Sequence, residues 1–306
     1  MPDGQGAAKP GGKREMIVIT NGTSPFSRLV VQHLLTRVPP GEIAVTTAEP
    51  DAAADLGAMG IDVRQERFDP TLDAMAFGAG DRVLVVSRPG DTGSGAPAGN
   101  AAAAVDAAVA AFAGHIAYTS IINADMTHHL GHLAIEETIK QSGVPFTLLR
   151  DNLYSEALLP ALRLASGTSE LIWSAGDRLL APAALTDYAE AAAIVLTDHQ
   201  PESRTLQLSG PLGLTALGVA SAFSQVLGKE IGVREVAAAD LDVALTGAGA
   251  SPEVAAELAT ILNDTSLGEW SVATQALEEL LGHDRISLVA ALQAANREGG
   301  GQSAGS

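Results

Sequence analysis

The chain has 306 residues, of which 46% are hydrophobic and none is cysteine. That is enough apolar material for a core without staples, and the lack of cysteine excludes a disulfide framework and a thiol nucleophile. The 36 acidic and 18 basic residues give a net charge of −18, which disfavours binding to nucleic acid. No stretch resembles a signal peptide or reaches the roughly 20 apolar residues of a membrane span, so we expect a cytoplasmic protein without membrane contact.

Short apolar runs alternate with helical patterns in the first half of the chain. Strands are predicted at Met16–Thr20, Ile43–Thr47, Asp62–Gln65, Arg82–Ser87, His115–Ser120 and Thr147–Arg150. Helices are predicted between them at Ser27–Arg37, Pro50–Met59, Thr71–Phe77, Ala96–Ala113 and His128–Ser142. Such alternation requires parallel crossovers. The sequence therefore predicts an α/β fold with a doubly wound parallel, Rossmann-like sheet over residues 15–152.

The second half is richer in helical patterns. Helices are predicted at Ser155–Ala165, Leu185–Thr197, Leu214–Gly228, Ala237–Thr246, Pro252–Asn263 and Ser287–Asn296, with strands at Glu170–Ser174 and Arg204–Ser209. We expect a smaller, helix-rich substrate lobe over residues 153–296, partly intertwined with the sheet. The polar, glycine-rich ends, residues 1–14 and 297–306, are expected to be disordered tails.

The first strand leads into the loop Asn21–Ser27, where a dinucleotide-binding fold normally has glycines. Ser24 is a good helix N-cap, and Pro25 suits the first helical position. In such sheets, ligands bind outside the carboxyl ends of the strands. This rule directs attention to the loop and to four further segments, Thr46–Asp51, Ser87–Gly95, Ser120–His132 and Asp151–Glu156.

Histidines are grouped on one predicted helix. His128, His132 and Glu136 follow each other at intervals of four residues on one helix face, a spacing that can bind zinc. Without a further ligand we expect no metal. His132 titrates near neutral pH, which suits a general acid or base, although a packing role is equally compatible with the sequence.

Three stretches resemble the NmrA-like atypical short-chain dehydrogenase/reductases, most closely their bacterial NADPH-dependent quinone oxidoreductases. They are His115–Ser120 with Asn123–Asp125, Ser142–Glu156, and Thr186–Ala192. The resemblance covers about Met16 to Leu281. It implies a Rossmann fold, an NAD(P)-binding domain and reduction of a small quinone or carbonyl compound.

The cofactor positions of that family are altered in this chain. The three glycines of its loop correspond to Asn21, Ser24 and Ser27, and a basic residue after the second strand corresponds to Ala48, beside Glu49. The family's histidine corresponds to His132, whereas a lysine beyond it corresponds to Glu137. The resemblance thus implies NADPH or NADH as cofactor, and the substitutions predict a degenerate, weakened cofactor site.

From these observations we assign candidate roles. The predicted cofactor-binding residues are Asn21, Gly22, Ser24, Phe26, Ser27 and Arg88. The predicted catalytic residues are His132, Thr119, Ser120 and Tyr118, of which the last is at least as compatible with a core position. The predicted substrate residues are Asn123, Asp125, Asn152 and Tyr154, although turn formation or loop capping also accounts for these types.

Three functions remain open from the sequence. The first is an NAD(P)H-dependent oxidoreductase acting on a small molecule. The second is a cofactor-independent isomerase, dehydratase or cyclase on the same scaffold with His132 as the base. The third is a ligand sensor or regulatory binding protein without catalysis. We expect a small-molecule substrate, no nucleic-acid partner, and a homodimer as one possible assembly.

Overall fold

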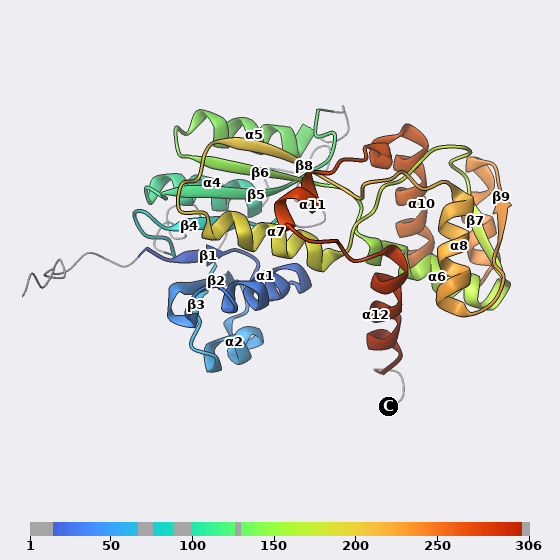
Figure 1. Ribbon diagram of the computed structural model, residues 1–306, viewed down its shortest axis with the longest axis horizontal. Coiled ribbons are helices and arrows are strands. Elements are labelled where there is room, and N and C mark those ends of the chain that lie inside the picture. Colours follow the sequence, from blue (N-terminus) through green and yellow to red (C-terminus); the bar gives the residue numbers. More distant parts are fainter. Residues whose placement is uncertain (1–14, 67–75, 88–99, 126–129, 302–306) are drawn as a thin grey trace, which may run out of the picture.

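A seven-stranded parallel sheet forms the larger part of the protein, as the computed structural model shows (Figure 1). The structure describes residues 15–66, 76–87, 100–125 and 130–301. In chain order the strands are β1 Ile17–Ile19, β2 Ile43–Thr47, β3 Asp62–Gln65, β4 Arg82–Val85, β5 His115–Ile121, β6 Phe146–Asp151 and β8 Arg204–Leu208. Their spatial order is β3-β2-β1-β4-β5-β6-β8. From β1 the strand order runs one way to β2 and β3 and the other way to β4 and β5. The switch point between β1 and β4 is where doubly wound folds bind ligands.

Helices cover both faces of this sheet because its strands are apolar on both sides. One face carries α1 Pro25–Leu35, α7 Leu185–Thr197 and α11 Ala276–Leu281, packed on residues such as Ile19, Leu84 and Leu149. The other face carries α4 Asn100–Ala110 and α5 Leu130–Gln141, packed on Val18, Val83, Tyr118 and Leu148. A 3₁₀ turn at Pro50–Ala53 leads into the short helix α2 Ala54–Ala58 beside β3.

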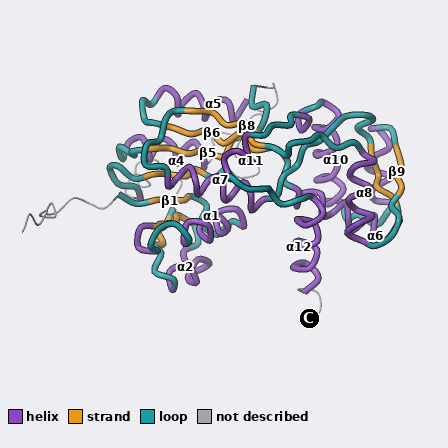
Figure 2. Tube along the Cα trace, in the orientation of Figure 1, coloured by secondary structure: helices purple, strands orange, loops and turns teal. Residues whose placement is uncertain are grey.

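A second lobe, built mostly of helices, lies beyond the carboxyl edge of the sheet (Figure 2). It consists of a 3₁₀ turn at Ser155–Leu158, α6 Leu159–Thr168, β7 Glu170–Trp173, α8 Ala216–Leu227, β9 Gly232–Glu235, α9 Leu241–Gly247, α10 Pro252–Leu267 and α12 Leu288–Gly301. The parallel pair β7 and β9 forms its only sheet among the described residues. A separate apolar core containing Trp173, Phe223 and Leu258 holds this lobe together.

The predicted fold class is confirmed, and several elements begin and end where the sequence predicts them. The chain returns to the large sheet late: α7 packs along α1, and β8 extends the sheet beside β6. The last helix, α12, continues to Gly301 and so runs into the segment that we expected to be a tail. Most of the helix expected at Thr71–Phe77 lies outside the described residues.

No helix in the described part of the chain combines the length and the apolar character that crossing a membrane requires.

Candidate active site

The loop between β1 and α1 keeps the backbone path of a dinucleotide cradle. Asn21 has a φ of 55°, in the left-handed region that asparagine tolerates better than most residues. The N–H of Gly22 donates to the Thr46 carbonyl at 2.8 Å, which holds the loop against β2. A Cβ added to Gly22 would lie 2.7 Å from the Cβ of Val45, so this position requires glycine for space.

Serines at the start of α1 are engaged in local hydrogen bonds. Ser24 is the N-cap, and its Oγ accepts the N–H of Ser27 at 3.1 Å. The Ser24 hydroxyl donates to Ser27 Oγ at 2.9 Å, and the buried Ser27 hydroxyl donates to the Thr20 carbonyl at 3.0 Å. Pro25 has no N–H. Among the described residues, no hydrogen bond involves the N–H groups of Thr23 or Phe26, which are therefore the donors left at this helix start.

The arginine that directly follows the loop, Arg28, is already paired with a carboxylate. Arg28, in the first turn of α1, donates to both carboxylate oxygens of Asp55 on α2, at 2.6 and 3.1 Å, and to the Ala52 carbonyl at 2.8 Å. Ala48, which follows β2, is exposed. Arg88, our other predicted cation, lies outside the described residues.

Tyr118 and His132 are brought together by the packing of α5 on β5. The Tyr118 hydroxyl lies 2.8 Å from His132 Nδ1, and both side chains are buried. Tyr118 therefore fixes the orientation of the imidazole ring. Tyr118 is in the middle of β5, three residues before Ile121 at its carboxyl end, and parallel sheets bind ligands at that edge.

Ser120 leads into a buried ionic network beneath α5. Its hydroxyl donates to Glu136 Oε1 at 2.6 Å, and Arg150 binds the same carboxylate with both Nε and Nη2, at 2.9 and 2.7 Å. Burial alone raises the pKa of Glu136, but the hydrogen bonds from Arg150 and Ser120 outweigh it, and the pKa lies below its ordinary value. Arg150 also pairs with Asp125 at 2.7 Å. Glu136 and Arg150 were absent from our predicted site.

Thr119 points to the opposite face of β5, as the alternation of side chains along a strand requires. Its Oγ1 accepts the N–H of Ser87 at 2.8 Å, and the two hydroxyl oxygens lie 3.2 Å apart. This bond joins the ends of β4 and β5. Thr119 and Ser120 therefore sit at the same edge of the sheet but on different faces.

The two predicted substrate asparagines hold the second lobe against the sheet. Asn123, with a φ of 54°, donates its amide to the Glu269 carbonyl at 2.8 Å. Asn152 donates to the Val272 carbonyl at 2.9 Å and more weakly to Trp270. Both side chains thus fix residues 269–272 as one wall at the carboxyl edge.

A buried acid and three aromatic rings lie on the α1 and α7 side of β6. Tyr154 stacks on Phe26 with ring centroids 6.3 Å apart and tilts against Tyr188 at 5.3 Å. Burial raises the pKa of Asp151 well above its ordinary value, and the nearby Tyr154 hydroxyl opposes that shift. Within the described residues neither carboxyl oxygen has a partner in ordinary hydrogen-bond geometry. Asp151 begins one of the segments that the strand-end rule selects, but it was not among the predicted site residues.

Metal ligation is unsupported by the described side chains, which contain no group of three or more histidine or acidic residues suited to a metal ion. His132 and Glu136 are turned to Tyr118 and Arg150 instead. His128, the remaining member of the spacing that suggested zinc, lies outside the described residues.

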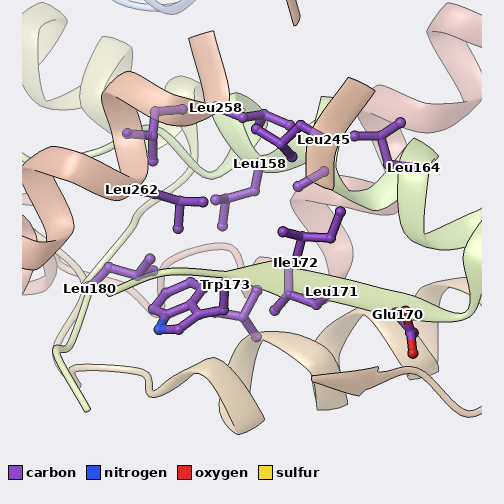
Figure 3. A pocket seen from close by; sticks show the side chains of 13 residues that line it. Leu158, Leu164, Glu170, Leu171, Ile172, Trp173, Leu180, Leu245, Leu258 and Leu262 are labelled. Atoms are coloured by element: carbon purple, nitrogen blue, oxygen red, sulfur yellow. The ribbon is translucent and has the colours of Figure 1, made fainter. Parts of the chain in front are cut away.

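One cavity of the described structure lies beside the start of α1 and is lined by Pro25, Arg28 and Glu156 among others. Another, apolar cavity in the second lobe is closed by Leu258 and Leu262 of α10 above Ile172 and Trp173 of β7, with Glu170 to one side (Figure 3). Its free volume is about 20 Å³, which accommodates about one water molecule. It is a packing defect rather than a substrate site. We place the site by its polar geometry and its position on the sheet.

Comparison with known proteins was made by sequence and by structure, and no family model matches the chain. Quinone oxidoreductase 2 of Escherichia coli (strain K12) is 32% identical over 278 residues, covering 89% of this chain and 96% of that protein. An NmrA-like family domain-containing oxidoreductase of Aspergillus flavus is 22% identical over 280 residues, covering 88% of this chain and 91% of that protein.

Two solved structures share the fold closely. The NADPH complex of the Escherichia coli quinone oxidoreductase has a TM-score of 0.83 at 30% identity, and the NADP(H) complex of triphenylmethane reductase from Citrobacter sp. has a TM-score of 0.83 at 28% identity. Each comparison covers 91% of this chain and 99% of the other.

Proposed function

The chain belongs to the NmrA-like atypical short-chain dehydrogenase/reductase family, and we propose that it uses a nicotinamide nucleotide to reduce a small quinone or carbonyl compound. The observation that supports the proposal is the hydrogen bond between Tyr118 of β5 and His132 of α5. It orients an imidazole on the α5 side of β5, a strand whose carboxyl end belongs to the edge where this fold binds its ligands.

The β1–α1 loop fits the backbone path of a dinucleotide, since Asn21 makes the turn and Gly22 allows the close approach to β2. The N–H groups of Thr23 and Phe26 would face the pyrophosphate, as donors at a helix N-terminus do. Ser24 and Ser27 would shape the loop through their own hydrogen bonds. The bound nucleotide would supply a hydride to the acceptor.

Reduction of a quinone or carbonyl also consumes one proton, while the nucleotide is oxidised. His132 would donate this proton to the acceptor oxygen, and the Tyr118 hydroxyl on Nδ1 would hold the ring in place. Thr119 and Ser120 would fix the strand ends around the acceptor, and Asn123 and Asn152 would hold the wall at 269–272. Tyr154 would close the side next to Phe26.

Turnover of a water-soluble benzoquinone, followed by loss of nicotinamide absorbance, tests the assignment. His132→Ala is expected to lower kcat by about 100-fold, within the range for general acid catalysis, with unchanged nucleotide affinity. The matched control is His283→Ala, because His283 is exposed beside Glu190, far from β5. Full turnover by His132→Ala would remove His132 from the mechanism.

One observation favours a second candidate, a cofactor-independent acid/base enzyme that uses His132. Pro25 has no N–H, and the Ser24 hydroxyl already takes the N–H of Ser27, so the start of α1 offers an anion fewer donors. This alternative predicts that neither NADH nor NADPH binds at millimolar concentration. A calorimetric titration with each nucleotide separates the two candidates.

A further inference from the structure

We propose that the ribose subsite of this protein is built for a free 2′-hydroxyl, so that it binds NADH in preference to NADPH. The inference rests on the proposed function, because it concerns the adenosine end of the same nucleotide. In doubly wound folds that end lies beside the second strand, where an acidic residue receives the 2′-hydroxyl of NAD or a cation receives the 2′-phosphate of NADP.

The carboxyl end of β2 has the features of a ligand subsite. Its carbonyl at Thr46 holds the cofactor loop through Gly22 N–H, so loop and strand end lie together. The Thr46 hydroxyl is buried and has no hydrogen-bond partner within the described residues. A buried hydroxyl without a hydrogen-bond partner destabilises the fold unless a ligand or a water molecule forms a hydrogen bond with it.

The charge at this place is negative. Glu49 is the second residue after β2, is exposed, and donates its N–H to Thr47 Oγ1 at 3.2 Å. Asp51 is exposed two residues later, and residues 48–63 contain no lysine or arginine. A 2′-phosphate would be repelled here, whereas a 2′-hydroxyl can donate a hydrogen bond to a carboxylate such as that of Glu49.

Among the described residues, the two arginines near this strand end, Arg28 and Arg64, are already paired with carboxylates. Arg28 reaches from α1 to the segment after β2, but Asp55 takes both arms of its guanidinium. Arg64 on β3 pairs with Asp62 at 2.8 Å and lies 3.8 Å from Asp81. NADPH would have to draw Arg28 away from Asp55 and leave that carboxylate beside its phosphate. The cost of that exchange falls on NADPH alone.

Dissociation constants for NADH and NADPH, from nucleotide fluorescence at one ionic strength, test the inference. In the wild-type protein we expect NADH to bind at least about tenfold more tightly, the effect of one charge-assisted hydrogen bond gained and a repulsion avoided. Glu49→Gln should reduce this ratio to about threefold or less, and Glu49→Arg should invert it. Asp55→Asn should strengthen NADPH binding by releasing Arg28 and leave NADH binding unchanged.

The control is Glu257→Gln on the exposed surface of α10, which makes the same change in net charge away from the subsite and should leave the ratio at its wild-type value. Binding of NADPH as tight as that of NADH, or a ratio that Glu49→Arg does not move, would overturn the inference and leave the proposed function standing. Absence of binding by both nucleotides would overturn the proposed function together with the inference.

Discussion

Arg150 and Asp151 are neighbours in β6, yet they lie on opposite faces of the sheet and in opposite electrostatic surroundings. Arg150 faces α5, where Glu136, Asp125 and Ser120 complete a network of charge-assisted hydrogen bonds. Asp151 faces α1 and α7 among aromatic rings, without a partner of ordinary geometry in the described part of the chain.

The difference shows that partners, rather than burial alone, decide whether a buried group is charged. Glu136 is buried like Asp151, but hydrogen bonds lower its pKa, whereas burial raises the pKa of Asp151. The α5 face can therefore keep a fixed charge beside His132. On the α7 face, burial instead favours the protonated form of Asp151.

Breaking the ion pair between Arg150 and Glu136, on the α5 face of β6, should have the largest effect on stability. Arg150→Met leaves Glu136 buried without its main partner, and we expect a loss of about 3–5 kcal/mol in the free energy of unfolding. Urea denaturation measures this loss. Arg163→Met on the exposed surface of α6 is the control, with an expected change within about 0.5 kcal/mol.

Replacing both partners sharpens the same point. The double variant Glu136→Met with Arg150→Met leaves no unpaired charge, and we expect it to recover most of the stability that Arg150→Met loses. If the double variant is as unstable as the single one, packing rather than charge pairing holds this face together.

On the α7 face of β6, Asp151 should make the stability of the protein depend on pH. The raised pKa of Asp151 means that its contribution to stability is fully present below the unfolded pKa, near 4, and is lost as pH rises through the folded pKa. Asp151→Asn removes this loss, so the variant should gain on the wild type by about 1.4 kcal/mol per unit of pKa elevation. Thermal melts from pH 4 to pH 9 measure it, with Asp106→Asn on exposed α4 as control. Parallel wild-type and Asp151→Asn curves would mean that Asp151 is ionised.

On the α5 face of β6, the pH dependence of stability should have the opposite sign, because the pKa of Glu136 is lowered. The lowered pKa of Glu136 gives stability that is present above the unfolded pKa, near 4.3, and is lost as pH falls through the folded pKa. Glu136→Gln should flatten this acid decline below pH 4 and leave the slope above pH 6 unchanged. A variant whose alkaline slope changes instead would show that the two faces are coupled.

The smallest effect is expected from Tyr154→Phe, which removes the hydroxyl near Asp151 and keeps the ring on Phe26. We expect a change of about 1 kcal/mol or less at pH 7, measured by urea denaturation. The alkaline loss of stability should extend to higher pH, because that hydroxyl lowers the pKa of Asp151. A loss above about 3 kcal/mol would mean that the phenol holds more than this acid.

Local pattern predicted the regular elements well where one periodicity dominated. Ile43–Thr47 and Leu185–Thr197 begin and end as predicted, because the first is a buried run rich in β-branched residues and the second an alanine-rich helical run. The strand β9 was missed, since Gly232–Glu235 is short, charged and largely exposed, and pairs only with β7. Helix α11 was also missed, because its six residues are too few for the i, i+4 spacing of Leu277 and Leu281 to stand out.

The sequence could predict individual residues of the candidate site, but not the contacts between them. Tyr118 and His132 were chosen separately, and their pairing depends on how α5 packs on β5. Asn123 and Asn152 bind carbonyls 146 and up to 120 residues away, which no local pattern contains. Glu136 and Arg150 were left out of the predicted site, because their ion pair forms only when α5 packs against β6.

Calorimetric titration of the wild-type protein with NADH tests the central claim, that the loop Asn21–Ser27 still serves a nicotinamide nucleotide. We predict one site per chain with a Kd below about 100 μM, inside the range usual for enzyme ligands. Absence of binding at about 1 mM NADH and 1 mM NADPH would contradict the account, because a nucleotide at about tenfold the predicted Kd limit would occupy most of the sites.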